Sequence, residues 1–243
     1  MIYVIGMGPG AEQMMTEEVL QALDSCDVII GYTVYLELLG ERFAKKEKRS
    51  TPMRQELARC RMCFEEEKAG KTVVMLCSGD AGVYGMAAPM YEMAVDYPDS
   101  ELVVLPGVTA ATSGAALLGA PINHDFCVIS LSDLLTPWEV IERRLRAAAM
   151  GDFAIVIYNP SSRHRADYLE KACKILLESG CNPMRACGLV ENIGRDGTQT
   201  RALTLEELMQ TSVNMFTTVF IGNSMTRIQG DKLITPRGYR AGH

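Results

Sequence analysis

Short apolar runs alternate with longer amphipathic segments along the chain, and this alternation predicts most of the secondary structure. In the first half, apolar runs rich in β-forming residues indicate buried strands at 3–5, 27–30, 73–77 and 101–105. Helical spacing, caps and breakers predict helices at 16–25, 52–68, 83–91 and 108–118. Because strands and helices alternate, we expect a mostly parallel sheet with helices on its faces.

The pattern changes at Gly119-Ala120-Pro121, where we place a domain boundary. Beyond it the sequence predicts strands at 125–131, 153–158, 185–190, 200–203 and 215–221, and helices at 137–148 and 163–178. The late strands follow one another closely, which favours antiparallel pairing. We therefore expect an α/β protein of two α/β domains: residues 1–119 with a mostly parallel sheet, and residues 120–243 of mixed α+β character.

Three turns rich in small residues each follow a predicted strand of the first domain. They are Gly6–Gly10, Ser78–Gly82 and Pro106–Ala110. Turns after parallel strands lie at the carboxyl edge of the sheet, where ligands bind in open α/β folds. A single turn of this kind also occurs as a plain connection, but three of them predict one shared cleft.

Composition and charge narrow the classes of partner. The formal net charge is −6 and the arginines are scattered, so we expect no nucleic-acid partner. No apolar run approaches the roughly 18–20 residues that a membrane span needs, so we expect no membrane association. The first residues already form a strand and show no basic signal-peptide region, so we expect a cytoplasmic protein.

The eight cysteines are expected to be reduced thiols in a cytoplasmic protein. Cys60-x-x-Cys63 has the spacing of a metal-binding pair, but a second such pair is absent from the sequence and the motif falls inside a predicted helix. We expect no protein-bound metal, and the sequence leaves open whether this pair binds anything.

The first turn, Gly6-x-Gly8-x-x-Ala11, satisfies a relaxed dinucleotide-binding fingerprint. That fingerprint also requires an acidic residue near the end of the second strand, and this strand ends Ile29-Ile30-Gly31-Tyr32 instead. Pro9 removes a backbone donor that a pyrophosphate would use. These features argue against a Rossmann dehydrogenase.

The stretches GMGPG, LCSGDAGVYGMA and LPGVTAATSGAALLGAP occur in an order and spacing that resemble the tetrapyrrole methylase family. Further along, HDFCVISLSDLLTPWEVIERRL, VIYNPSSRHR, VENIGRDG and MFTTVFIGNSMTR resemble the branch that methylates C17 of precorrin-3B or cobalt-precorrin-3B in cobalamin biosynthesis. The likeness covers essentially the whole chain. Enzymes that methylate uroporphyrinogen III usually carry a proline after the Gly-Asp pair, whereas this chain has Ala81.

The resemblance implies a homodimer that binds the methyl donor S-adenosylmethionine in a cleft between two domains and takes a tetrapyrrole as substrate. It also implies the residues that contact the donor. These are Pro9, Ser78, Gly79, Asp80, Val83, Thr109 and Ala110 from the first domain, and Asn159, Ile193 and Thr217 from the second.

A tetrapyrrole with many carboxylates needs cationic and polar partners. Arg163 and Arg165 are the best local cations for it, although a solvated helix start would have the same sequence. Ser130 and Ser132 lie in a polar loop that either meets the substrate or caps the next helix. The catalytic residues stay unknown from sequence; the candidates for proton transfer are His124, Asp125 and Asp133.

The sequence therefore predicts transfer of a methyl group to C17 of a precorrin-3B-type tetrapyrrole with ring contraction. The alternatives are another C-methyltransferase of uroporphyrinogen III or a precorrin, a non-catalytic tetrapyrrole carrier, and a ribosomal-RNA methyltransferase of the same superfamily. Intact donor turns disfavour the carrier, and the acidic composition disfavours the RNA enzyme. Whether the substrate carries cobalt stays open; the many Cys and Met residues slightly favour the cobalt form.

Overall fold

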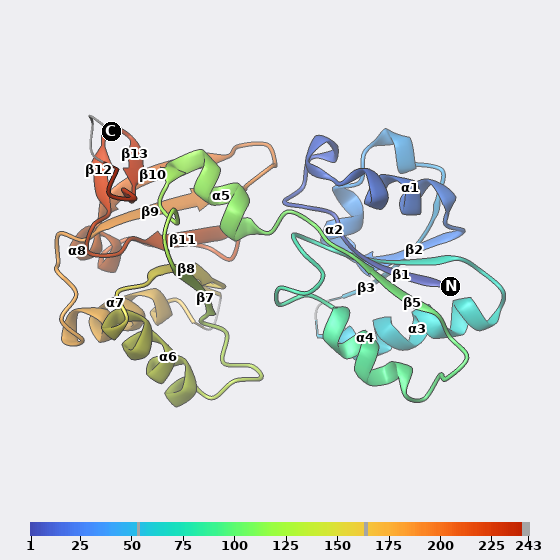
Figure 1. The fold of residues 1–243 in the computed structure, drawn as a ribbon. Helices are drawn as coiled ribbons and strands as arrows, with labels where there is room; N and C mark the ends of the chain where they lie inside the picture. Colours follow the sequence, from blue (N-terminus) through green and yellow to red (C-terminus); the bar gives the residue numbers. More distant parts are fainter. Residues whose placement is uncertain (53, 163–164, 240–243) are drawn as a thin grey trace. The chain divides into compact units, whose positions relative to one another are not determined.

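A computed structural model describes residues 1–52, 54–162 and 165–239 and divides the chain into two compact units, Met1–Ala110 and Ala111–His243 (Figure 1). Each unit has its own central sheet and its own core. The sequence assigned residues 108–118 to the first domain, and the functional boundary after residue 119 stays a prediction.

The first unit is built on a five-stranded sheet with the order β3-β2-β4-β1-β5, and all of its strand pairs are parallel. Its strands are β1 (Ile2–Gly6), β2 (Val28–Tyr32), β3 (Glu47–Thr51), β4 (Val73–Cys77) and β5 (Leu102–Leu105). Its helices are α1 (Glu17–Ser25), α2 (Thr33–Glu37), α3 (Glu56–Lys68) and α4 (Ala87–Ala94), with 3-10 turns at Glu12–Met14 and Glu41–Phe43. The predicted parallel sheet is confirmed.

Alternating side chains of this sheet enter two separate cores. Val4 and Met75 pack with residues of α3 and α4, such as Phe64, whereas Ile5 and Leu76 pack with residues of α1 and α2. Figure 1 accordingly shows helices on both faces of the sheet. Strands buried on both faces read as unbroken apolar runs, which is why the sequence revealed them.

The second unit has a mixed five-stranded sheet with the order β10-β9-β11-β8-β7, in which only β7 and β8 pair in parallel. These strands are β7 (Phe126–Ser130), β8 (Ala154–Tyr158), β9 (Ala186–Glu191), β10 (Gln199–Thr204) and β11 (Thr217–Ile221). The helices are α5 (Ala110–Leu118), α6 (Trp138–Met150), α7 (Tyr168–Glu178) and α8 (Leu205–Met209). The predicted antiparallel pairing of the late strands is confirmed.

Helices again cover both faces of this sheet (Figure 1). The main core lies between the sheet and α6, α7 and α8. On the other face α5 approaches closely, since a Cβ added to Gly114 would lie 2.7 Å from the Phe220 ring. A small sheet of β6 (Gly119–Ala120), β12 (Arg227–Gln229) and β13 (Lys232–Ile234) completes the unit.

Three predicted helices begin later than the sequence indicated. The helix expected from residue 52 begins at Glu56, and the helix expected from Val83 begins at Ala87. The helix expected from Arg163 begins at Tyr168; Arg163 and His164 themselves lie outside the described residues. Positive φ angles at Arg54 and Tyr84 explain the first two delays, because a residue in the left-handed region interrupts a right-handed helix.

Candidate functional site

The three small-residue turns of the first unit lie side by side because their strands do. β1 lies between β4 and β5, and the three strands run parallel, so the turns leave the sheet at one edge. The backbones of Gly8 and Gly79 exchange two hydrogen bonds, with N–O distances of 3.0 and 2.7 Å. A Cβ on Gly107 would lie only 2.2 Å from the Gly79 oxygen. Side chains are therefore excluded where the turns meet.

Asp80 ties two of these turns together. One carboxylate oxygen accepts a hydrogen bond from the Gly82 amide at 2.8 Å, and the other accepts one from the Gly107 amide at 2.9 Å. Sequence reasoning assigned Asp80 to the donor and missed this bond to the third turn. The SGD motif alone gave no signal for it, because Gly107 is close only in the folded sheet.

Gly79 lies at an open position in this gathering of turns. Its φ of +68° is in the left-handed region, which favours glycine. A Cβ there would meet nothing nearer than the Thr109 Cα at 3.8 Å and the Ala110 nitrogen at 4.0 Å. The structure thus leaves room at Gly79, bounded by the third turn, for the close approach of a ligand to backbone. The edge brings together Pro9, Ser78, Gly79, Asp80, Thr109 and Ala110, and Val83 follows in the turn before α4.

In the second unit, the predicted residues gather at one edge of the mixed sheet. Asn159 follows β8 with a φ of +52°, and its Nδ2 donates to Ser130 Oγ at the end of the adjacent strand β7, at 2.9 Å. Thr217 opens β11, which runs antiparallel to β8, so it lies at the same edge. Ile193 follows β9, whose last residue Glu191 pairs with Thr217.

Exposure differs among these residues. Asn159 is exposed, whereas Thr217 and Ile193 are only 5% and 6% exposed. The Thr217 hydroxyl is also shared with Asn214, since it accepts from the Asn214 amide at 3.3 Å. Asn159 is therefore the member of this set that presents most polar surface to a ligand.

Asp133 lies in the loop after β7 and forms a cluster with Arg165 and Tyr168. It accepts hydrogen bonds from the Tyr168 hydroxyl at 2.7 Å and from Arg165 Nε at 2.6 Å. The hydrogen bond from Tyr168, reinforced by Arg165, lowers the pKa of the Asp133 carboxyl. A carboxylate with a lowered pKa is a weaker proton acceptor, so this geometry disfavours Asp133 as a general base.

Arg165 is largely enclosed in the same cluster. Its side chain is 13% exposed, and its Nη1 lies 3.4 Å from Ser162 Oγ. The Ser132 amide donates to Ser130 Oγ at 3.2 Å, so the polar loop caps itself at least in part. Contact of Arg165, Ser130 and Ser132 with a substrate stays a prediction, and Arg163 lies outside the described residues.

His124 and Asp125 are not brought to this edge. Both are exposed and precede β7, whereas Ser130 ends that strand. A strand of this length separates its ends by about 13 Å, at about 3.3 Å per residue. The structure therefore places these two candidates for proton transfer at the opposite end of β7 from Asn159 and Ser130.

Cys60 and Cys63 lie within α3 and face the core of the first unit. Burial raises the pKa of the Cys60 thiol to about 11 and the pKa of the Cys63 thiol well above its usual value. Among residues 1–52, 54–162 and 165–239, no three His, Cys, Asp or Glu side chains are arranged to hold a metal ion.

Within the same residues, no helix is long and apolar enough to cross a bilayer.

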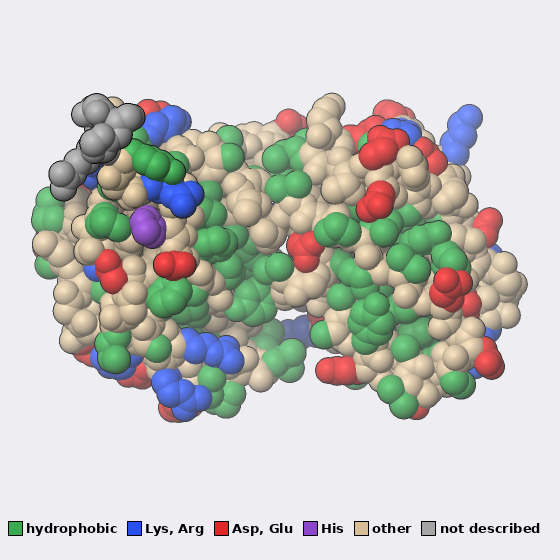
Figure 2. Space-filling view, in the orientation of Figure 1, with side chains coloured by type: hydrophobic (Ala, Val, Ile, Leu, Met, Phe, Trp, Pro, Cys, Tyr) green, Lys and Arg blue, Asp and Glu red, His purple; other side chains and the backbone are tan. Residues whose placement is uncertain are grey.

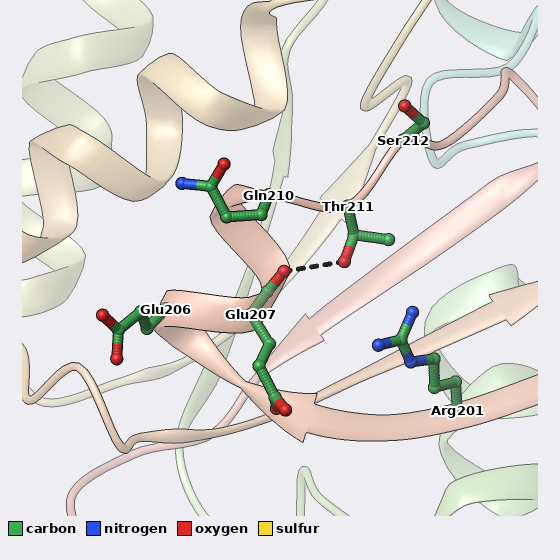
Figure 3. A pocket seen from close by; sticks show the side chains of 6 residues that line it. All are labelled: Arg201, Glu206, Glu207, Gln210, Thr211 and Ser212. Atoms are coloured by element: carbon green, nitrogen blue, oxygen red, sulfur yellow. Dashed lines mark hydrogen bonds between the residues drawn. The ribbon is translucent and has the colours of Figure 1, made fainter.

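A surface hollow lies in the second unit, at β10 and α8. Arg201, Glu206, Glu207, Gln210, Thr211 and Ser212 line it (Figure 3). Glu207 completes a capping box with Thr204 at the start of α8, and the Thr211 hydroxyl donates to the Glu207 carbonyl at 2.7 Å. These polar groups cap the two ends of a short helix, and the two glutamates make the hollow a poor site for a polyanion.

Surface charge agrees with the composition. On the face drawn in Figure 2, Lys and Arg side chains occur in small separate groups with Asp and Glu between them. Oppositely charged side chains also pair directly, as Arg146 does with Glu142 and Glu178.

Comparison with known proteins defines the class first. The sequence model of the family described as "Tetrapyrrole (Corrin/Porphyrin) Methylases" matches residues 1–209, so the chain belongs to this family. The predicted family is thereby confirmed. A solved structure described as "Crystal structure of the methyltransferase CobJ" superposes with a TM-score of 0.89 at 37% identity, covering 97% of this chain and 99% of that one.

Two relatives narrow the comparison to one branch. The chain is 42% identical to "Probable cobalt-factor III C(17)-methyltransferase" of Salmonella typhimurium, over 98% of this chain and 99% of that protein. It is also 42% identical to "Cobalt-factor III methyltransferase" of Priestia megaterium, over 98% of this chain but only 45% of that protein. The chain thus matches the full length of one relative and less than half of the other.

Proposed function

We propose that the protein transfers a methyl group from S-adenosylmethionine to C17 of a precorrin-3B-type tetrapyrrole, with ring contraction, in cobalamin biosynthesis. The observation that carries the proposal is the 42% identity, over nearly the whole of both chains, to a protein named for C17 methylation of cobalt-factor III. Because both relatives are named for cobalt-factor III, we propose that the substrate carries cobalt.

The turns of the first unit are proposed to bind the methyl donor, whose sulfonium supplies an activated methyl group. The open position at Gly79 and the exclusion of side chains from neighbouring backbones fit a ligand held close to main chain. Methyl transfer from such a donor depends chiefly on alignment, which a rigid set of turns provides. The residues proposed to contact the donor are Pro9, Ser78, Gly79, Asp80, Val83, Thr109 and Ala110.

We propose a donor contact for Asn159, Ile193 and Thr217 of the second unit as well. The hydrogen bond from Asn159 Nδ2 to Ser130 Oγ at 2.9 Å orients the Asn159 amide, which supports a role for this exposed side chain in ligand binding. Ser130, Ser132, Arg163 and Arg165 are proposed to meet the substrate, whose carboxylates require hydrogen-bond donors and positive charge.

The remaining properties are proposals with indirect support. A net charge of −6 and dispersed basic side chains support an enzyme that binds neither nucleic acid nor membrane. Eight cysteines without a disulfide in the structure support action in the reducing cytoplasm. We also propose a homodimer and chemistry without a protein-bound metal, both of which follow from the family resemblance.

Mass spectrometry of the macrocycle tests the proposed function. The protein is incubated with S-adenosylmethionine and reduced cobalt-factor III, and the expected product carries one additional methyl group located at C17. A parallel reaction with the metal-free macrocycle tests the assignment of cobalt. Binding of the macrocycle without methyl gain would identify a carrier. A protein that neither binds the macrocycle nor methylates it would refute the proposal entirely.

A further inference from the structure

The loop that joins β7 to α6, residues 131–137, carries an unusual pair of side chains. Leu134 is 58% exposed and Leu135 is 98% exposed, which makes Leu135 the most exposed large apolar side chain among the residues that the structure describes. An isolated exposed leucine is ordinary, but two adjacent ones at the tip of a loop beside polar site residues need a reason.

The base of this loop is held from several directions. The Leu131 amide donates to the Tyr158 carbonyl at 3.0 Å, and the Leu131 side chain is fully buried. Asp133 is clamped by Arg165 and by the Tyr168 hydroxyl. Trp138, which follows the loop, packs on the Tyr168 ring with centroids 4.6 Å apart. The two leucines are therefore presented by an anchored loop.

The same loop begins at the edge that carries Asn159. Ser130, which accepts the Asn159 hydrogen bond, is the last residue of β7 and also accepts from the Ser132 amide. Leu135 is five residues beyond Ser130, so its Cα lies within about 18 Å of it even for a fully extended chain. The leucine pair thus belongs to the surface around the proposed substrate residues.

We propose that Leu134 and Leu135 form an apolar contact for the flat face of the tetrapyrrole macrocycle. This inference rests on the proposed function, because it names the part of the substrate that this loop contacts. A tetrapyrrole combines apolar ring faces with a rim of carboxylates, so its site needs apolar surface as well as cations. The cations and hydroxyls proposed above bind the carboxylates of the rim. The leucine pair contacts the ring face, where burial of apolar area supplies affinity.

Leu135→Ala, alone and combined with Leu134→Ala, tests this contact, with Met150→Ala as the matched control. Met150 is 85% exposed and ends α6, whereas the loop precedes the start of that helix. Thirteen helical residues separate the two ends by about 20 Å. Leu135→Met, which keeps most of the apolar area, is the conservative variant.

Affinity is measured by absorbance titration with cobalt-factor III, and donor binding by calorimetry with S-adenosylhomocysteine. We expect Leu135→Ala to weaken macrocycle binding about tenfold and the double variant more, because truncation of a leucine removes apolar area that the ligand buries. The loss should persist at high salt, which screens the carboxylate contacts but not the apolar one. Leu135→Met and Met150→Ala should bind as the wild type does.

The outcomes separate this inference from the proposed function. Unchanged macrocycle affinity in the double variant, with normal methyl transfer, would overturn the inference and leave the function intact. Lost donor affinity or a lowered melting temperature would show a structural loop, and an altered oligomeric state would show a protein interface; either would overturn the inference. A wild type that neither binds nor methylates the macrocycle would overturn both.

Discussion

Replacement of Gly79 by leucine is the sharpest test of the donor site. The φ of +68° makes any side chain at this position strained, and the left-handed conformation costs roughly 1–2 kcal/mol. Outside its chain neighbours, the atom nearest to an added Cβ is the Thr109 Cα at 3.8 Å, so the Cβ itself fits without a clash. A leucine would fill the space that we assign to the donor, and we expect the affinity for S-adenosylhomocysteine to fall at least 100-fold, about 2.7 kcal/mol.

Gly70→Leu is the matched control, because Gly70 has a φ of +87° and a Cβ there meets nothing within 4 Å. Both variants should lose a similar 1–2 kcal/mol of stability, which lowers the melting temperature by roughly 2–8 °C in a domain of this size. Calorimetry measures donor affinity, and thermal unfolding measures stability. Equal donor affinity in the two variants would refute the assignment of the donor to these turns.

Three further predictions follow from single contacts. Asp80→Asn should lower the free energy of unfolding in urea by about 1–3 kcal/mol, because an amide cannot accept from both Gly82 and Gly107; Asp99→Asn, at an exposed position, should be neutral, and equal losses would contradict the reasoning. Because the pKa of Asp133 is lowered in the folded protein, its carboxylate stabilises the fold at pH values above the ordinary pKa of 3.8. This stabilisation is lost as the pH falls through the lower pKa of the folded state. The difference in unfolding free energy between wild type and Asp133→Asn should therefore shrink from pH 6 to pH 3. Burial raises the pKa of Cys60 to about 11, so this thiol should resist alkylation at pH 8 until the protein unfolds, and rapid labelling of the native protein would contradict its burial.

The sequence predicted the parts of the fold that hydrophobic burial dictates. Strands such as β4 are buried on both faces, so their residues form apolar runs that cannot be mistaken for solvent-exposed segments. The edge strand β3, Glu47–Thr51, was missed because it pairs with β2 alone and its residues EKRST are mostly polar. The three strands of the small sheet span two or three residues each, which is too short for a period to be visible.

The sequence also predicted which turns of the first unit would meet, but not how they are joined. Their meeting follows from parallel strands, whose carboxyl ends share an edge. The hydrogen bond from the Gly107 amide to Asp80 depends on the strand order β4-β1-β5. This order brings the turns after β4 and β5 to either side of the first turn, although Asp80 and Gly107 are 27 positions apart in the chain. Likewise, the charge of Arg165 was evident from sequence, whereas its partner Asp133 lies 32 positions away along the chain and is close only in the folded unit.

In the proposed function, the two units recognise their ligands by different means, and the difference follows from the chemistry of each ligand. The turns of the first unit consist largely of backbone, since a Cβ on Gly6 or on Gly107 would lie only 2.5 or 2.2 Å from the Gly79 oxygen. Such a surface suits a small donor that must be aligned for transfer. For the macrocycle, the second unit instead presents side chains: Ser130 and Arg165 are polar, and Leu134 and Leu135 are exposed and apolar. A large macrocycle with apolar faces and an anionic rim requires that mixture, because neither backbone amides nor apolar contacts alone would match both of its surfaces.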